Sequence, residues 1–112
     1  MDLQSLSREL RLFAQARDWE GFHTPKNLVM AMSVEMAELL EHFQWLTAEQ
    51  SQQLAADPAR LEAVALEMAD VLLYLVRLAD VLDVDLATAA ARKLRLNAQK
   101  YPALYSEAEV PV

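Results

Sequence analysis

Apolar residues recur every three or four positions through most of this chain, the spacing that gathers them on one face of an α-helix. The first such repeat predicts a helix over about residues 2–17 and is made by Leu3, Leu6, Leu10 and Phe13. The polar segment 18–23, which contains the only glycine, interrupts the repeat. We therefore expect the first helix to end there.

Capping signals divide the rest of the chain. Thr24-Pro25 and Asp57-Pro58 each place a capping residue before a proline, which is favoured at the first helical position. The helices that they open are predicted over about 25–45 and 58–82. Between them, Thr47 with Gln50 resembles a capping box and predicts a short helix that ends near residue 56. Asp85 caps a last helix that reaches residue 101, before Pro102, and we expect residues 103–112 to fray.

The segment 58–82 carries a sustained apolar stripe, formed by Leu61, Val64, Met68, Leu72, Leu75, Leu78 and Leu82. The second and fourth segments are long helices joined through a short one, so that their natural packing is an antiparallel pair. The sequence thus predicts an all-α fold, with antiparallel helical hairpins that form a four-helix-bundle-type core in one domain over residues 1–112.

Composition narrows the class of protein. Of the 112 residues, 54% are hydrophobic, more than one small core needs, and we interpret the surplus as apolar faces that a partner subunit covers. The absence of cysteine excludes disulfides and thiolate metal sites. A net charge of −7 argues against binding to a nucleic-acid polymer. Residues 1–10 lack the apolar core of a signal peptide and no run approaches membrane-spanning length, so we expect a cytoplasmic protein without membrane contact.

Two pairs of acidic residues stand in apolar surroundings on the two long helices. Glu35 and Glu38 are three residues apart, and Glu67 and Asp70 repeat that spacing, which places each pair on one helix face. If the helices are antiparallel, the pairs can meet. Either pair alone is also typical of a solvated helix face. Glu41 is ambiguous between an outer ligand and a surface charge, and we expect Glu62 to face solvent.

Four carboxylates that meet between two helices would repel one another and lose hydration, at a cost of several kcal/mol per ion. Proton uptake or bound hard cations would relieve this cost. Ligands that are all oxygen favour Mg²⁺ or Mn²⁺ over zinc. A ferritin-like di-iron site would need Glu-x-x-His, and the second pair has no histidine.

Three aromatic residues are candidates to contact a nucleotide base beside such a metal site: Trp19, Trp45 and Tyr74. Trp19 and Trp45 stand at segment ends, and Tyr74 lies one helical turn after Asp70. Residues of these types also commonly complete a core with their polar edge satisfied. His23, in a polar loop, is a candidate substrate contact, and His42 a candidate for the edge of the site.

The last predicted helix carries a polar stripe of Lys93, Asn97 and Tyr101, with Lys100 nearby. The lysines could meet phosphate oxygens, and Asn97 a base or sugar. The alternative is a solvated face whose cations complement the helix dipole. No Ser-His-Asp or Cys-His arrangement supports catalysis by a side-chain nucleophile.

With these residues, the sequence resembles the MazG-like all-α nucleoside triphosphate pyrophosphohydrolases. The family signature, Glu-x-x-Glu followed after an insertion by Glu-x-x-Asp, stands here as Glu35-Met-Ala-Glu38 and Glu67-Met-Ala-Asp70. Flanking segments are most similar to the dCTP pyrophosphatase branch: residues 17–20, Phe22-His23, Pro25, Asn27-Leu28, residues 39–45, and Lys93 through Asn97 to Tyr101-Pro102. The resemblance covers roughly residues 10–103. His42 departs from it, because an apolar residue is expected there. Since the N-terminus is short, we expect no contacts from a longer leader.

The resemblance implies hydrolysis of a nucleoside triphosphate, with dCTP or a modified pyrimidine dNTP foremost, to the monophosphate and pyrophosphate. It implies that Glu35, Glu38, Glu67 and Asp70 bind Mg²⁺, that Trp19, Trp45, Tyr74, Lys93 and Asn97 surround the substrate, and that the chain forms a homodimer or homotetramer. We expect Glu38 to orient the attacking water as the catalytic carboxylate. Two other hypotheses stay open: a non-catalytic helical oligomer that binds a nucleotide or a partner protein, and a metallohydrolase of phosphate monoesters or cyclic nucleotides.

Overall fold

The computed structural model describes residues 1–106 and 108. Within this part of the chain there are five α-helices, one 3₁₀ turn and no strand. The helices are α1 (Leu3–Ala16), α2 (Pro25–Glu41), α3 (Ala48–Gln53), α4 (Pro58–Leu82) and α5 (Leu86–Lys100), and the 3₁₀ turn η1 (Leu54–Ala56) follows α3. The predicted all-α class is therefore confirmed. Of the tail expected to fray, residues 107 and 109–112 lie outside the described residues.

Side-chain caps explain where the helices begin. The Thr24 hydroxyl accepts from the backbone N–H of Asn27 at 3.2 Å, and the Asp85 carboxylate accepts from that of Thr88 at 3.0 Å. Both halves of the capping box at α3 are formed, and Asp57 caps α4. Such a cap stabilises a helix by about 1 kcal/mol.

The end of α2 differs from the prediction. The helix ends at Glu41 rather than near Trp45. The backbone N–H groups of His42 and Phe43 donate to the carbonyls of Leu39 and Leu40, so that the chain tightens into turns with three-residue spacing. Trp45 therefore lies in a turn beyond the helix, where its indole is 86% exposed.

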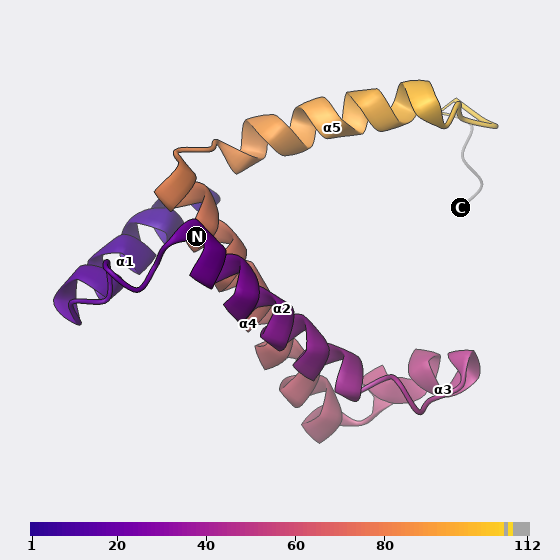
Figure 1. The fold of residues 1–112 in the computed structure, drawn as a ribbon. Helices are drawn as coiled ribbons and strands as arrows, with labels where there is room; N and C mark the ends of the chain where they lie inside the picture. Colours follow the sequence, from indigo (N-terminus) through magenta and orange to yellow (C-terminus); the bar gives the residue numbers. More distant parts are fainter. Residues whose placement is uncertain (107, 109–112) are drawn as a thin grey trace.

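The antiparallel pair of α2 and α4 is the centre of the molecule, and α1 lies against α4 (Figure 1). Among the described residues, the buried apolar ones are few: Ala14, Leu28, Leu54, Val64, Val76 and Ala79. Helix α5 extends away from the pair as an arm (Figure 1). No helix in the described part of the chain has the combination of length and apolar character that is needed to cross a bilayer.

One chain alone does not complete a bundle. Its radius of gyration is 17.6 Å, against about 13 Å for a compact domain of this length. Its accessible surface is 8972 Å², roughly 2,800 Å² more than the ~6,200 Å² typical of a compact monomer of this mass. Most of the α4 stripe is exposed, including Leu61, Met68, Leu72, Leu75 and Leu82. The four-helix-bundle-type core is therefore not formed within one chain, and its completion by oligomerisation stays a prediction.

Candidate active site

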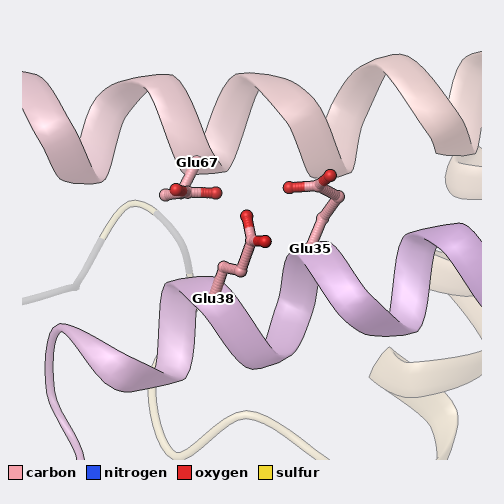
Figure 2. Close-up of side chains that lie close together, drawn as sticks. All are labelled: Glu35, Glu38 and Glu67. Atoms are coloured by element: carbon pink, nitrogen blue, oxygen red, sulfur yellow. The ribbon is translucent and has the colours of Figure 1, made fainter.

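Three carboxylates meet between α2 and α4. Glu35 and Glu38 from α2 and Glu67 from α4 point toward one another across the space between the two helices (Figure 2). One carboxylate oxygen of each lies within 4.8 Å of the others. The antiparallel packing of the two helices thus brings Glu67 of the second acidic pair against both members of the first pair.

Two oxygens in this cluster are buried without a partner. Glu35 and Glu67 are half-buried, and the Oε2 atom of each is shielded from solvent with no hydrogen-bond donor in the described part of the chain. A buried acceptor left unpaired costs about 1–3 kcal/mol, and more when it is charged. The cluster therefore favours any arrangement that adds positive charge between these oxygens.

The pKa values of the carboxylates also indicate that the cluster favours added positive charge. Burial, foremost, and then the adjacent Glu38 carboxyl raise the pKa of Glu35 to about 7, with further repulsion from Asp70 and Glu67. Burial and the negative charge of Glu38 also raise the pKa of Glu67. Raised carboxyl pKa values show that the site holds a proton more readily than an isolated carboxylate does, and a divalent cation can replace such a proton.

The other candidate residues lie further from the cluster of three carboxylates. Asp70 lies outside the group joined within 4.8 Å, yet its charge contributes to the raised pKa values of both Glu35 and Glu67. His42 acts in the opposite direction on the pKa of Glu67, which places it at the edge of the site. Glu41 and Glu62 are exposed, as a surface charge would be.

The two tryptophans lie at opposite ends of α2. Trp19 precedes this helix and Trp45 follows it, and a 17-residue helix is about 25 Å long. The two indoles therefore do not face one base within a single chain. Trp19 is 42% exposed and packs edge to face against Phe13, with ring centroids 5.7 Å apart. Tyr74 is half-buried on α4, four residues beyond Asp70.

The α5 residues are also separate from the carboxylates of their own chain, because α5 extends away from the α2–α4 pair (Figure 1). Lys93 and Tyr101 are exposed and Asn97 is half-buried. The Lys100 ammonium lies 5.4 Å from the centre of the Tyr101 ring. The structure therefore does not bring the predicted phosphate and sugar contacts to the cluster within one chain.

His23 has a partner that the sequence analysis did not identify. Arg77, the one buried charged residue in the described part of the chain, donates through Nε to His23 Nδ1 at 3.1 Å. Its NH1 group donates to Asp80 at 2.8 Å, and Asp80 also accepts two hydrogen bonds from Arg11. The available signal was a lone arginine inside the apolar run 71–82, with an aspartate three residues later.

Comparisons with known proteins identify the family and several relatives. Residues 30–109 match the MazG-like family. The chain is 42% identical over 101 residues to human dCTP pyrophosphatase 1, and 42% identical over 100 residues to the rat protein of that name. These alignments cover 90% and 89% of this chain, which spans 59% of the length of either relative. The crystal structure of a pyrophosphatase from Archaeoglobus fulgidus DSM 4304 superimposes with a TM-score of 0.80 at 41% identity, over 89% of this chain and 92% of that one.

Proposed function

Because the chain belongs to the MazG-like family, we propose that it hydrolyses a nucleoside triphosphate to the monophosphate and pyrophosphate. We propose dCTP, or a modified pyrimidine dNTP, as its substrate, since its curated relatives are dCTP pyrophosphatases. The observation that carries this proposal is the cluster of Glu35, Glu38 and Glu67 between α2 and α4.

The cluster fits a hard divalent cation. We propose that Glu35, Glu38, Glu67 and Asp70 hold Mg²⁺, with Mn²⁺ as a substitute, because the ligand atoms are all carboxylate oxygens. The buried, unpartnered Oε2 atoms of Glu35 and Glu67 are the atoms that such an ion would satisfy. When bound, the metal neutralises phosphate charge and lowers the pKa of a coordinated water.

Glu38 is our candidate for the carboxylate that orients the attacking water and accepts its proton. Glu35 and Glu67 each have a buried oxygen for which the described residues provide no hydrogen-bond donor, so they are the carboxylates that depend most on a cation. Glu38 lies between them (Figure 2), and it is not among the residues whose carboxylate oxygens are buried without a hydrogen-bond partner in the described part of the chain. A carboxylate with an oxygen to spare can act as a general base toward a water beside the substrate phosphates.

The remaining substrate contacts point to an active site shared between copies of the chain. Trp19, His23, Trp45, Tyr74, Lys93, Asn97 and Tyr101 are our proposed contacts, and one chain spreads them from the start of α2 to the end of α5. A homodimer or homotetramer would bring α5 and one tryptophan of a second copy toward the cluster. The excess exposed surface, roughly 2,800 Å², exceeds the ~800 Å² that each partner buries in a standard interface. We expect an enzyme that consumes free nucleotides to act in the cytoplasm.

The experiment that tests the function is a panel of canonical and 5-substituted NTPs and dNTPs, incubated with the protein with and without Mg²⁺. Pyrophosphate and the nucleoside monophosphate should appear in equal amounts, only with the metal, and fastest from dCTP or its 5-substituted analogues. Orthophosphate as the product would indicate a different metallohydrolase. A folded protein that binds nucleotides without turnover would be a non-catalytic binding oligomer.

A further inference from the structure

A ladder of polar side chains fixes the turn that precedes α2. Arg11 on α1 pairs with Asp80 on α4 through two hydrogen bonds of 2.6 and 3.1 Å. Asp80 accepts a third, of 2.8 Å, from Arg77, and Arg77 donates to His23 in the turn. The Asp80 and Arg77 side chains are only 12% and 9% exposed, so that the inner part of the ladder is shielded from water. The ladder therefore joins α1, α4 and the turn, through a half-exposed outer pair at Arg11 and shielded inner contacts at Asp80 and Arg77.

The hydrogen bond from Arg77 to His23, which we call the last rung of the ladder, determines which nitrogen of His23 carries the proton. A guanidinium group has hydrogen-bond donors and no acceptor. Because Arg77 Nε–H faces Nδ1, that nitrogen must accept, and neutral His23 carries its proton on Nε2. Partial burial, first, and the charge of Arg77, second, lower the pKa of His23 from its usual value of 6.5. His23 is therefore neutral at physiological pH, and the rung is formed.

The Trp19 indole rests on this histidine. The ring centroids of Trp19 and His23 are 6.0 Å apart, and the backbone N–H of His23 donates to the Trp19 carbonyl at 3.1 Å. Trp19 also packs against Phe13, whose ring is covered by the Arg17 guanidinium at 3.4 Å. The Arg17 guanidinium also lies 6.0 Å from the centre of the Trp19 ring. A shift of the imidazole would therefore remove one of the contacts that hold the indole.

We propose that Arg77 is a positioning residue for substrate binding, which acts through His23 Nδ1 to hold the Trp19 ring where it receives the base. This proposal rests on the proposed function in so far as Trp19 contacts a base. The contact between Arg77 and His23 selects one orientation of the imidazole, and the imidazole in turn sets the position of the indole. The three residues come from α4 and from the turn, so that the packing of the turn on α4 is coupled to substrate affinity.

Protonation of His23 at low pH would break its hydrogen bond with Arg77. Arg77 on α4 is the charged side chain that contacts His23, and Asp80 links it to Arg11 on α1. The segment that carries His23 also contains Asp18 and Glu20. Asp80 is already shared by two arginines. A second proton on His23 would turn Nδ1 into a donor facing a donor and would add a positive charge beside Arg77. We therefore expect the Trp19 support to loosen as the pH falls through the pKa of His23, which burial and Arg77 hold below its usual value of 6.5.

Two substitutions of His23 separate positioning from general stability. In His23→Asn the amide oxygen stands close to where Nδ1 was and can still accept from Arg77. His23→Gln places its amide further out and loses that acceptor. In a Trp45→Phe background, so that Trp19 alone emits, His23→Asn should keep the wild-type emission spectrum and His23→Gln should shift it to the red. The emission should change with acid in the parent and stay constant in His23→Asn.

A second pair of variants tests the effect on substrate. Arg77→Lys can still pair with Asp80 but cannot also reach His23, whereas Arg11→Gln removes the outer pairing and leaves the last rung. Arg77→Lys should raise KM about tenfold at an unchanged kcat, the size of effect of losing one stacked base contact. Arg11→Gln should lower the melting temperature and leave KM as it was. Mg²⁺ affinity should be the same in both variants.

Equal emission from the two His23 variants, or equal KM values for Arg77→Lys and Arg11→Gln, would overturn the positioning role. If the parent protein turns over no nucleotide, the proposed function fails, and the emission experiment still decides whether Arg77 holds Trp19 through His23.

Discussion

Mg²⁺ binding at the carboxylate cluster should release protons, in an amount that depends on pH. The pKa of Glu35 is raised to about 7 by its burial and by the adjacent Glu38, so that about half of the Glu35 side chains carry a proton at pH 7. A carboxylate must lose its proton to bind a metal. Glu35 alone should therefore release about 0.5 proton per site at pH 7, about 0.9 at pH 6 and about 0.1 at pH 8. The raised pKa of Glu67 adds to this in the same direction.

The assay is isothermal titration calorimetry of MgCl₂ into the protein, in two buffers of the same pH and ionic strength but different ionisation enthalpy. The difference in observed enthalpy gives the number of protons released. Glu35→Gln should lose the Glu35 share at pH 7, whereas Glu62→Gln, a matched change at an exposed glutamate of α4, should keep it. If the observed enthalpy does not depend on the buffer at pH 7, or if equal release occurs at pH 6 and pH 8, the electrostatic account of the cluster is refuted.

Three further results follow from burial and exposure. Because the pKa of Glu35 is raised from 4.5 to about 7 in the folded state, its destabilising effect grows as the pH rises between these two values and is complete above them. The gain in melting temperature from Glu35→Gln without Mg²⁺ should therefore be larger at pH 8 than at pH 5.5, and an equal gain would contradict this. Leu28→Ala, at a side chain only 1% exposed, should lower the free energy of unfolding by about 2–5 kcal/mol in urea denaturation, whereas Leu104→Ala, at 92% exposure, should change it by less than about 0.5 kcal/mol. Leu72→Asp, on the exposed α4 stripe, should reduce the mass measured by light scattering to that of one chain; an unchanged oligomer would mean that this stripe is not the interface.

Local signals in the sequence predicted the helices well. Both bounds of α4 were predicted correctly, because Asp57-Pro58 marks its start and the apolar repeat ends at Leu82. The predicted end of α2, near residue 45, was wrong, because no proline or glycine marks the point where the chain tightens into turns after Glu41. Helix starts depend on a side chain and its near neighbours, and such contacts can be read from the sequence.

The carboxylate cluster was predictable for a similar reason. Glu35, Glu38 and Glu67 follow from a helical spacing of three and an antiparallel pairing, which together leave little freedom. The contact between Arg77 and His23 joins residues 54 positions apart and depends on how the turn packs on α4. Nothing in the local sequence specifies that packing, so the ladder became visible only in the structure.

The apolar stripe of α4 illustrates a further limit. Its repeat predicts a buried face, but a repeat does not state which chain provides the cover. In the structure much of the stripe, including Met68 and Leu72, is exposed. Sequence periodicity therefore predicted the amphipathic helix, and the exposed surface of the folded chain identifies the face that we expect a partner to cover.

The most direct test of the central claim is pyrophosphate release from dCTP in the presence of Mg²⁺, compared between the parent protein, Glu38→Gln and Glu62→Gln. The two substitutions are chemically identical and lie on the two paired helices, one inside the carboxylate cluster and one outside it. The account predicts pyrophosphate and dCMP from the parent and from Glu62→Gln, and loss of turnover in a folded Glu38→Gln. Substantial turnover by Glu38→Gln, or none by the folded parent protein, would contradict it.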